Sequence, residues 1–344
     1  MRALVYAGPG RMELTDVEEP ALRRPDDVKV RIAMTGICGT DHKILAGKLD
    51  VAGKGTVLGH EGVGTVVETG DAVTRVKPGD RVVINPTQSC GTCRNCRLGA
   101  YCYCLHFDDH QVGFTLAGTF AEYYVGTAQY LYPIPDGMSW QVASLIEPLG
   151  CSLNSVLKSG LQPHETVLVI GSGAIGLLCQ SIARRLGRLT VATEPNAFRR
   201  AFAAGIAHHA LHPDELTPET IARLTDGKGF DVVIDAVGNQ LTTAMDAVAK
   251  GGRVVPMGYD DTYRAEIAPT RLIDAGLSIV AAVPLHDAIG PALDFSARLP
   301  ELARMVTTEV DMADFRDAFE STMGIDPRTG RKVEITSVKA VIRS

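Results

Sequence analysis

The spacing of apolar residues divides the chain into two parts. Residues 2–6 and 27–33 alternate between apolar and polar side chains, as strands with one buried face do, and a proline-rich link joins them. From residue 166 onward, continuous apolar runs alternate with segments of helical periodicity, a rhythm typical of a buried parallel sheet. We therefore predict an α/β chain, with an antiparallel barrel followed by a doubly wound parallel sheet.

A glycine-rich turn follows the first apolar run of the second part. Residues 166–170 form the predicted strand, residues 171–176 read Gly-Ser-Gly-Ala-Ile-Gly, and residues 177–186 have helical apolar spacing. The glycines allow a tight bend, close approach of a pyrophosphate to the backbone and close helix packing, while the helix N-terminus favours an anion. The predicted dinucleotide site contains Gly171, Gly173, Ala174, Ile175 and Gly176.

The end of the next predicted strand, at residues 189–193, bears on the choice of nucleotide. Glu194 follows this strand, and an acidic side chain there accepts hydrogen bonds from the adenosine ribose and repels a 2′-phosphate. Arg199 and Arg200 keep the alternative open, because arginine binds phosphate in a bidentate manner. We expect NAD rather than NADP, with Arg199 at the cofactor.

Length and charge limit the classes of protein to consider. A chain of 344 residues with 45% hydrophobic residues is typical of two globular domains. The net charge of −6 is unfavourable for binding a nucleic-acid backbone. The sequence contains no apolar run of signal-peptide or membrane-spanning length, so we expect a cytoplasmic protein that binds no nucleic acid and no membrane.

Four cysteines are spaced as the ligands of one metal ion. Cys90, Cys93 and Cys96 form two C-x-x-C steps, and Cys104 returns after seven residues. Thiolates are the soft ligands that a closed, tetrahedral structural zinc site uses. A disulfide-bonded lobe and a zinc-knuckle interaction module are the alternatives, but neither an oxidising compartment nor a strongly basic surface is indicated. We expect a structural zinc here and reduced thiols at Cys38, Cys102, Cys151 and Cys179.

A thiol, an imidazole and a carboxylate lie in an earlier glycine-rich stretch. Cys38, His60 and Glu61 are the ligand types of a catalytic zinc, which takes three protein ligands and leaves one position open. Taken singly, His60 would be interpreted as a surface or hydrogen-bonded core histidine, and Glu61 as a solvated charge. Glycines at positions 59, 62 and 64 favour the functional interpretation, because a backbone without side chains allows close approach to a metal.

Several motifs together resemble the zinc-dependent medium-chain alcohol dehydrogenases. They are Gly-Ile-Cys-Gly-Thr-Asp at 36–41, Gly-His-Glu-Gly-Val-Gly at 59–64, Val-Lys-Pro-Gly-Asp-Arg-Val at 76–82, and the four-cysteine lobe. The resemblance implies a GroES-like β-barrel catalytic domain that carries both zincs, and a Rossmann domain. We expect the catalytic domain at 1–145 and 285–344, its structural-zinc lobe at about 86–106, and the NAD-binding domain at 146–284.

By this resemblance, Cys38, His60 and Glu61 approach the catalytic zinc. The segment Ile146-Glu147-Pro148-Leu149 looks like the polyol (sorbitol-type) and butanediol branch, in which Glu147 faces the zinc directly or through water. Cys151 is the competing ligand, and we interpret it as an ordinary buried thiol.

The resemblance also implies a proton relay that begins at Thr40, whose hydroxyl takes the substrate proton. Asp41 is expected to orient His60, as a carboxylate behind a ligating imidazole does. Relatives often have a histidine where this chain has Lys43, while His42 lies one position earlier. His42 replaces that histidine only if its ring points inward; the alternative is a solvent-facing side chain.

The expected reaction is hydride transfer between a secondary alcohol and NAD. Val237 and Val283, at the ends of later strands, are expected to border the cofactor. Substrates with neighbouring hydroxyls, such as polyols, sugars, cyclitols and diols, are favoured, and relatives imply a homo-dimer or homo-tetramer. A threonine-type or simple alcohol dehydrogenase and a catalytically silent NAD-binding protein remain as alternatives. The polar segment 324–331 has no predicted role.

Overall fold

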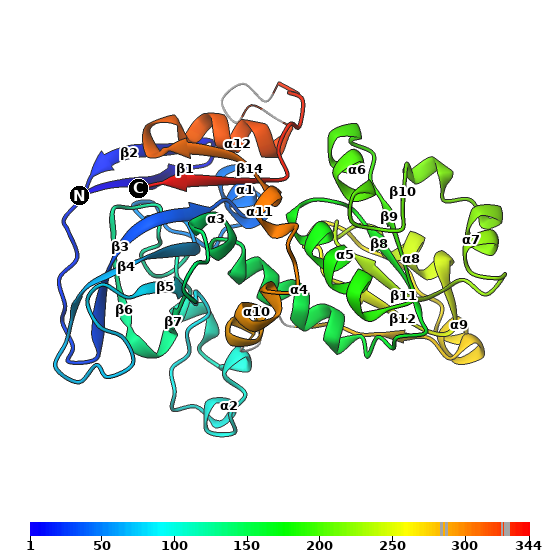
Figure 1. The fold of residues 1–344 in the computed structure, drawn as a ribbon, viewed down its shortest axis with the longest axis horizontal. Coiled ribbons are helices and arrows are strands. Elements are labelled where there is room, and N and C mark those ends of the chain that lie inside the picture. Colours follow the sequence, from blue (N-terminus) through cyan, green and yellow to red (C-terminus); the bar gives the residue numbers. More distant parts are fainter. Residues whose placement is uncertain (283–284, 286–287, 325, 327–330) are drawn as a thin grey trace. The chain divides into compact units, whose positions relative to one another are not determined.

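The computed structural model describes residues 1–282, 285, 288–324, 326 and 331–344. It divides into two compact units, drawn in Figure 1: unit 1 comprises Met1–Glu147 and Ile289–Ser344, and unit 2 comprises Pro148–Ala288. None of the helices within these described ranges is long and apolar enough to cross a bilayer.

Unit 1 is built mainly from antiparallel strands. Strands β1 (Arg2–Gly8) and β2 (Arg11–Asp16) form a hairpin, and a larger sheet has the order β14-β15-β3-β4-β5-β7 with β6 paired to β3. Only β14 and β15 pair in parallel within the described part of that sheet. Its strands are β3 (Asp27–Gly36), β4 (Glu61–Thr69), β5 (Arg81–Ile84), β6 (Tyr123–Thr127), β7 (Leu131–Pro133), β14 (Val306–Asp311) and β15 (Lys339–Arg343).

Short helices close unit 1 at its edges. Helix α12 packs against β14 and β15, and its phenylalanines join the core that also contains Leu4 of β1 and Phe120. A second apolar cluster includes Val30, Val66 and Val82, which come from β3, β4 and β5. The helices are α1 (Gly39–Leu45), α2 (Arg94–Arg97), α3 (Trp140–Ala143), α10 (Ile289–Ser296), α11 (Leu302–Met305) and α12 (Phe315–Met323).

Unit 2 contains a parallel sheet of order β10-β9-β8-β11-β12-β13. Helix α5 packs on β8 and β9, and α8 packs on β11 and β12, so buried apolar strands alternate with covering helices. The strands are β8 (Thr166–Ile170), β9 (Leu189–Thr193), β10 (His209–Leu211), β11 (Phe230–Asp235), β12 (Val248–Pro256) and β13 (Ser278–Ile279). The helices are α4 (Ile146–Lys158), which begins at the unit boundary, α5 (Ala174–Leu186), α6 (Ala197–Ala204), α7 (Pro218–Leu224), α8 (Leu241–Ala247) and α9 (Pro269–Ala275).

The predicted fold class, a mainly antiparallel part with a parallel Rossmann-type sheet, is confirmed. Strands 166–170 and 189–193 have the bounds that the apolar pattern predicts. Strand β2 is not predicted by that pattern, because its short polar-rich stretch resembles part of the link.

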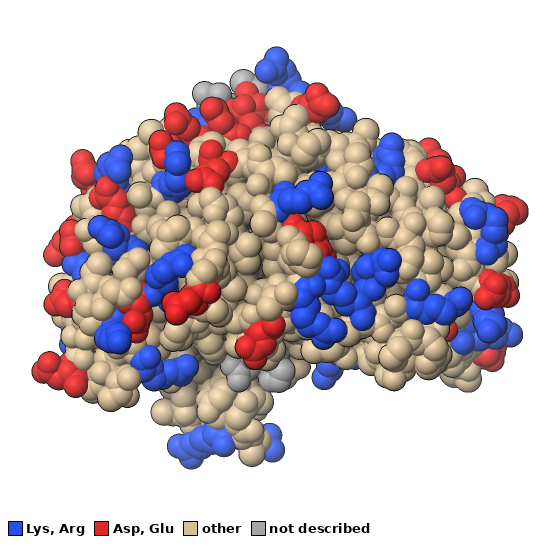
Figure 2. All heavy atoms as spheres, viewed as in Figure 1, with Lys and Arg blue, Asp and Glu red and all other residues tan. Residues whose placement is uncertain are grey.

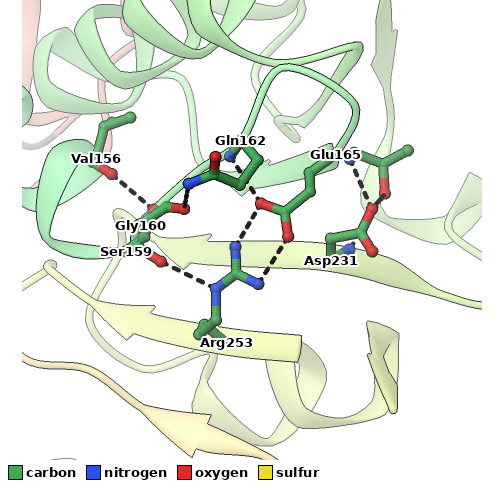
Figure 3. Close-up of polar contacts among 8 residues, drawn as sticks. Val156, Ser159, Gly160, Gln162, Glu165, Asp231 and Arg253 are labelled. Carbon is green, nitrogen blue, oxygen red and sulfur yellow. Dashed lines mark hydrogen bonds and ion pairs between the residues drawn. The ribbon is translucent and has the colours of Figure 1, made fainter. Parts of the chain in front are cut away.

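An ion pair ties the segment before β8 to β12. The Arg253 guanidinium makes two hydrogen bonds to the Glu165 carboxylate, at 2.8 and 2.5 Å, and donates from Nε to Ser159 O at 2.9 Å, as Figure 3 shows. Glu165 also accepts the Gln162 N–H at 2.8 Å. These contacts tie the segment before β8 to β12, which lies two strands away in the sheet.

Candidate metal centres and cofactor turn

Three metal-ligating side chains meet where β3 and β4 run side by side. The strands are antiparallel with Gly36 opposite Glu61, so the chain that leaves β3 passes the start of β4. Cys38 precedes α1, and His60 immediately precedes β4. The donor atoms of Cys38, His60 and Glu61 lie within 4.8 Å of one another, close enough to share one ion. One thiolate, one imidazole and one carboxylate are a donor set that fits zinc.

Asp41 stands behind this trio and contacts two of its members. One oxygen of this fully buried carboxylate accepts the Cys38 N–H at 2.9 Å, and the other lies 3.7 Å from Nδ1 of His60. Burial raises the pKa of Asp41. Burial alone would lower the pKa of His60, but the charges of Asp41 and Cys38 outweigh it and raise the pKa well above its usual value. At 3.7 Å this is an ion-pair contact, and neither Oδ1 of Asp41 nor Nδ1 of His60 makes a hydrogen bond within the described residues. A carboxylate on the Nδ1 side of an imidazole leaves Nε2 for a metal.

Lys339 on β15 is a buried cation beside Glu61, and sequence reasoning missed it. Its Nζ donates to Ile37 O at 2.9 Å and pairs with Glu61, and the two side chains are only 3% and 1% exposed. Burial alone would lower the pKa of Lys339, but the Glu61 carboxylate raises it, so the ammonium form persists. A Cβ at Gly36 would collide with both groups. The one available signal was a lysine inside the otherwise apolar run 338–342.

Glu147 lies outside the trio but acts on it. It is 8% exposed in the first turn of α4, and its charge contributes to the raised pKa of both His60 and Lys339. Cys151, one turn further along α4, is a buried cysteine. The structure therefore brings the negative charge of Glu147 near the site.

The remaining residues of the predicted relay lie on α1. Thr40 Oγ1 is 3.5 Å from Cys38 Sγ, so its hydroxyl is beside the trio. Nε2 of His42 instead lies 2.9 Å from Thr322 Oγ1, and the ring packs edge-on against Phe319, both on α12. His42 thus joins α1 to α12. Lys43 is partly buried in the same helix.

Phe114 is a further neighbour of the trio that the sequence did not indicate. Its ring centroid lies 4.9 Å from that of His60. The surrounding turn packs closely on the backbone that precedes His60: Gly113 has φ +80°, and a Cβ there would lie 2.5 Å from Gly59 O. Phe114 therefore covers one face of the imidazole with an apolar ring.

The four-cysteine lobe gathers its sulfurs as the spacing predicts. Sγ–Sγ distances are 3.4 Å for Cys93–Cys96 and 4.0 Å for both Cys90–Cys96 and Cys93–Cys104. Zn–S bonds of about 2.3 Å in a tetrahedron require sulfurs about 3.8 Å apart, so the cluster fits zinc. Backbone N–H groups, first that of Thr92, lower the pKa of Cys90 to about 5, which favours the thiolate. On the face drawn in Figure 2, a few basic groups lie at the bottom, where Figure 1 places α2 of the lobe.

The glycine turn of unit 2 joins β8 to α5. Gly171 has φ +95°, in the left-handed region that glycine tolerates, and a Cβ at Gly176 would lie 2.1 Å from Gly171 O. A Cβ at Gly171 would lie 2.7 Å from a methyl of Val237, so the predicted Val237 adjoins the turn. Val283 lies outside the described residues. The bare backbone at the N-terminus of α5, the 13-residue helix that includes Ala174 and Ile175, fits a nucleotide pyrophosphate.

Glu194 is fixed beside this turn. One of its oxygens accepts the Ser172 N–H at 2.7 Å and the other the Asn196 N–H at 2.9 Å. Arg199 Nη1 would lie 4.0 Å from a Cβ at Gly173, and burial lowers the pKa of Arg199. Arg200 instead donates to Glu194 O at 2.9 Å and so braces the backbone. Glu194 and Arg199 therefore both lie at the turn.

Two domain families match the sequence. The alcohol dehydrogenase GroES-like domain matches residues 24–136, and the zinc-binding dehydrogenase domain matches residues 174–298. The first match covers β3 to β7 of the unit 1 sheet, and the second covers β9 to β13 of the unit 2 sheet.

Two named relatives align with most of the chain. Sorbitol dehydrogenase of Bacillus subtilis is 27% identical over 94% of this chain and 94% of its own. A protein named as D-xylulose reductase A of Emericella nidulans is 34% identical over 74% of each chain.

A solved structure shows the same fold over the whole length. The crystal structure of a protein described as a zinc-binding dehydrogenase from Sinorhizobium meliloti 1021, bound to NADP, superposes with a TM-score of 0.89. It is 27% identical and covers 100% of this chain and 99% of its own. With both domains and the ligand clusters in place, the chain belongs to the zinc-binding, medium-chain alcohol dehydrogenase family of oxidoreductases.

Proposed function

We propose that this enzyme transfers a hydride between a secondary alcohol of a polyol, sugar, cyclitol or diol and NAD. The observation that carries the proposal is the Cys38–His60–Glu61 trio, in which His60 and Glu61 are buried, with Glu147 nearby. This anionic donor set suits zinc and polyhydroxylated ligands. The names of the sorbitol and D-xylulose relatives support the substrate class.

The residues of the site have separate tasks in this proposal. Cys38 and His60 would hold a catalytic zinc, with Glu147 facing it directly or through water and Glu61 held beside it by Lys339. When bound, zinc supplies a Lewis acid that lowers the pKa of an alcohol. Thr40 would relay the proton of the substrate hydroxyl, receiving it as its own hydroxyl proton passes on to solvent, and Asp41 would lie behind the imidazole. The lobe would hold the second zinc of the chain, which has a structural role.

We propose NAD as the preferred cofactor. Glu194 is held by two backbone N–H groups, so its carboxylate is fixed where an adenosine ribose is expected and where a 2′-phosphate would be repelled. Arg199 at the same turn supports the competing choice, and the Sinorhizobium relative is bound to NADP. The ratio of kcat/KM for NAD to that for NADP tests this choice directly.

A homo-dimer or homo-tetramer is also proposed. Strand β13 is an edge of the unit 2 sheet, and both of its residues are exposed, which leaves backbone groups able to pair with a second copy. Light scattering at micromolar concentration measures the mass; a monomer would contradict the proposal.

The decisive experiment measures NADH formation with a panel of polyols, cyclitols, diols and simple alcohols, with and without a chelator. Chelator-sensitive turnover that is greatest with a polyhydroxylated substrate would support the proposal. A preference for ethanol or for an amino alcohol such as threonine would establish the simple or threonine-type activity instead. Binding of NAD without turnover of any alcohol would favour a silent protein.

A further inference from the structure

A glutamine is buried in the middle of the helix that follows the glycine turn. Gln180 of α5 has no exposed surface, and its neighbours Cys179 and Ile182 are equally buried. Burying a primary amide is unfavourable unless its hydrogen bonds are made. Its position in a helix that otherwise packs apolar side chains on β8 and β9 therefore requires an explanation.

The amide group of Gln180 is directed at the turn. Its Nε2 lies 2.9 Å from Ser172 Oγ and 3.3 Å from Gly171 O. Gly171 O can only accept a hydrogen bond, so the nitrogen rather than the oxygen of the amide must face it. Oε1 of Gln180 is buried and makes no hydrogen bond within the described part of the chain. Gln180 therefore contributes two donated hydrogen bonds to the glycine turn.

Ser172 connects this amide to the acidic residue at the end of β9. Its hydroxyl accepts from Gln180, and its N–H donates to Glu194 at 2.7 Å. The N–H of Gly171 is held by Thr193 O at 2.8 Å. A turn of small residues has much conformational freedom, and these contacts reduce it from two sides. Among the contacts described, Gln180 supplies the side-chain donors to Gly171 and Ser172, while Ser152 Oγ donates further along, to Ile175 O at 3.5 Å.

We propose that Gln180 is a positioning residue for the cofactor. Its amide holds Gly171 and Ser172 in the conformation that receives the pyrophosphate, and through Ser172 it keeps Glu194 in place for the ribose. Pre-organisation of a binding loop increases affinity because less conformational freedom is lost when the ligand binds. This inference rests on the proposed binding of NAD by unit 2.

The test compares Gln180→Leu with the unaltered protein by titrating NADH and NADPH fluorescence. We expect the Kd for NADH to rise roughly three- to tenfold, which corresponds to the loss of one or two hydrogen bonds. The Kd for NADPH should rise less, because a loosened Glu194 repels the 2′-phosphate less effectively. The KM for NAD should rise by a larger factor than kcat falls, a split that general destabilisation would not produce.

Ser181→Ala is the matched control. Ser181 is the next residue of α5, is fully buried, and its hydroxyl makes no hydrogen bond in the described ranges. It should leave the Kd for NADH unchanged, so an equal effect of both substitutions would overturn the inference.

A double-mutant cycle with Ser172→Ala separates positioning from packing, and Ser172→Ala alone provides the test if Gln180→Leu does not fold. In the Ser172→Ala background, Gln180→Leu should raise the Kd by a smaller factor than in the unaltered background. An unchanged Kd in folded Gln180→Leu, or full additivity of the two changes, would overturn the inference while leaving the proposed function intact. Failure of the unaltered protein to bind NADH would overturn both.

Discussion

The two cysteine-containing sites of unit 1 are assembled in opposite ways. The lobe takes every sulfur from residues 90–104, and its spacing alone predicts the cluster. The Cys38–His60–Glu61 site takes groups from the end of β3, the start of β4 and, through Lys339, from β15. Its ligand types are visible in the sequence, but its charge balance exists only after the sheet has formed. Local spacing therefore specifies the structural site, whereas long-range pairing sets the electrostatics of the proposed catalytic site.

The largest expected effect follows from removing Cys38, a ligand of the proposed catalytic zinc. Cys38→Ala should lower turnover by about a thousandfold or more, because several kcal/mol of charge stabilisation depend on the metal. Metal analysis should show one zinc lost and the lobe zinc retained. Cys151→Ala removes a buried thiol outside the trio and serves as the control. Comparable turnover of Cys38→Ala and the unaltered protein would remove Cys38 from the proposed ligands.

The second prediction concerns the buried ion pair that the sequence did not reveal. Lys339→Met leaves the Glu61 carboxylate buried without its cation, which should lower the free energy of unfolding by about 3–5 kcal/mol. The double substitution Lys339→Met with Glu61→Gln removes both charges and should recover much of that loss. Urea denaturation of the three variants measures the recovery. If Lys339→Met costs less than about 1 kcal/mol, the pair is not a determinant of this site.

The sequence predicts those parts of the molecule that depend on neighbours along the chain. Strands β8 and β9, the glycine turn and the four-cysteine lobe follow from short apolar runs and fixed spacings. The contact between Lys339 and Glu61 does not, because it joins residues that are far apart in the sequence. Strand β2 does not either, because its short polar-rich stretch resembles part of the link. Gln180 belongs with the second group: a polar residue inside an apolar helix signals an unusual environment but does not identify the atoms it binds.

Residue roles follow the same division. The sequence predicts Asp41 as the partner of His60 only through the resemblance, and the structure places its carboxylate 3.7 Å from the ring nitrogen. For His42, the sequence leaves an inward and a solvent-facing orientation open, and neither includes the contact with Thr322 on α12. Helix α12 is distant in sequence, so no local pattern could predict that contact.

The third prediction addresses the lobe, where we expect an effect on stability rather than chemistry. Cys93→Ser removes one of four sulfurs, and the free energy of unfolding should fall by about 2 kcal/mol, within the range for loss of a structural group. One zinc should be lost per chain, as in Cys38→Ala. Turnover per folded molecule should change far less than in Cys38→Ala. A thousandfold loss of turnover in folded Cys93→Ser would show that the two sites are not functionally separate.

The smallest effect is expected from a long-range polar pair that carries no chemistry, Glu165 with Arg253. The hydrogen bond from Arg253 lowers the pKa of Glu165, so the pair stabilises the protein above the ordinary glutamate pKa of 4.5 and loses its effect as the pH falls through the lower folded value. At pH 7, Glu165→Gln should cost about 1 kcal/mol, since the pair is bidentate but partly solvated. The difference from the unaltered protein should shrink in acid, whereas Glu266→Gln, at an exposed glutamate of the same unit, should show no such pH dependence. Thermal melts between neutral and acidic pH measure the stability of both variants. If the stability difference between Glu165→Gln and the unaltered protein grew in acid, the stabilisation would come from a source other than the carboxylate. Glu165 and Arg253 are also brought together from distant parts of the chain, so long-range assembly alone does not distinguish a functional site. The distinguishing feature is the set of donor atoms around His60.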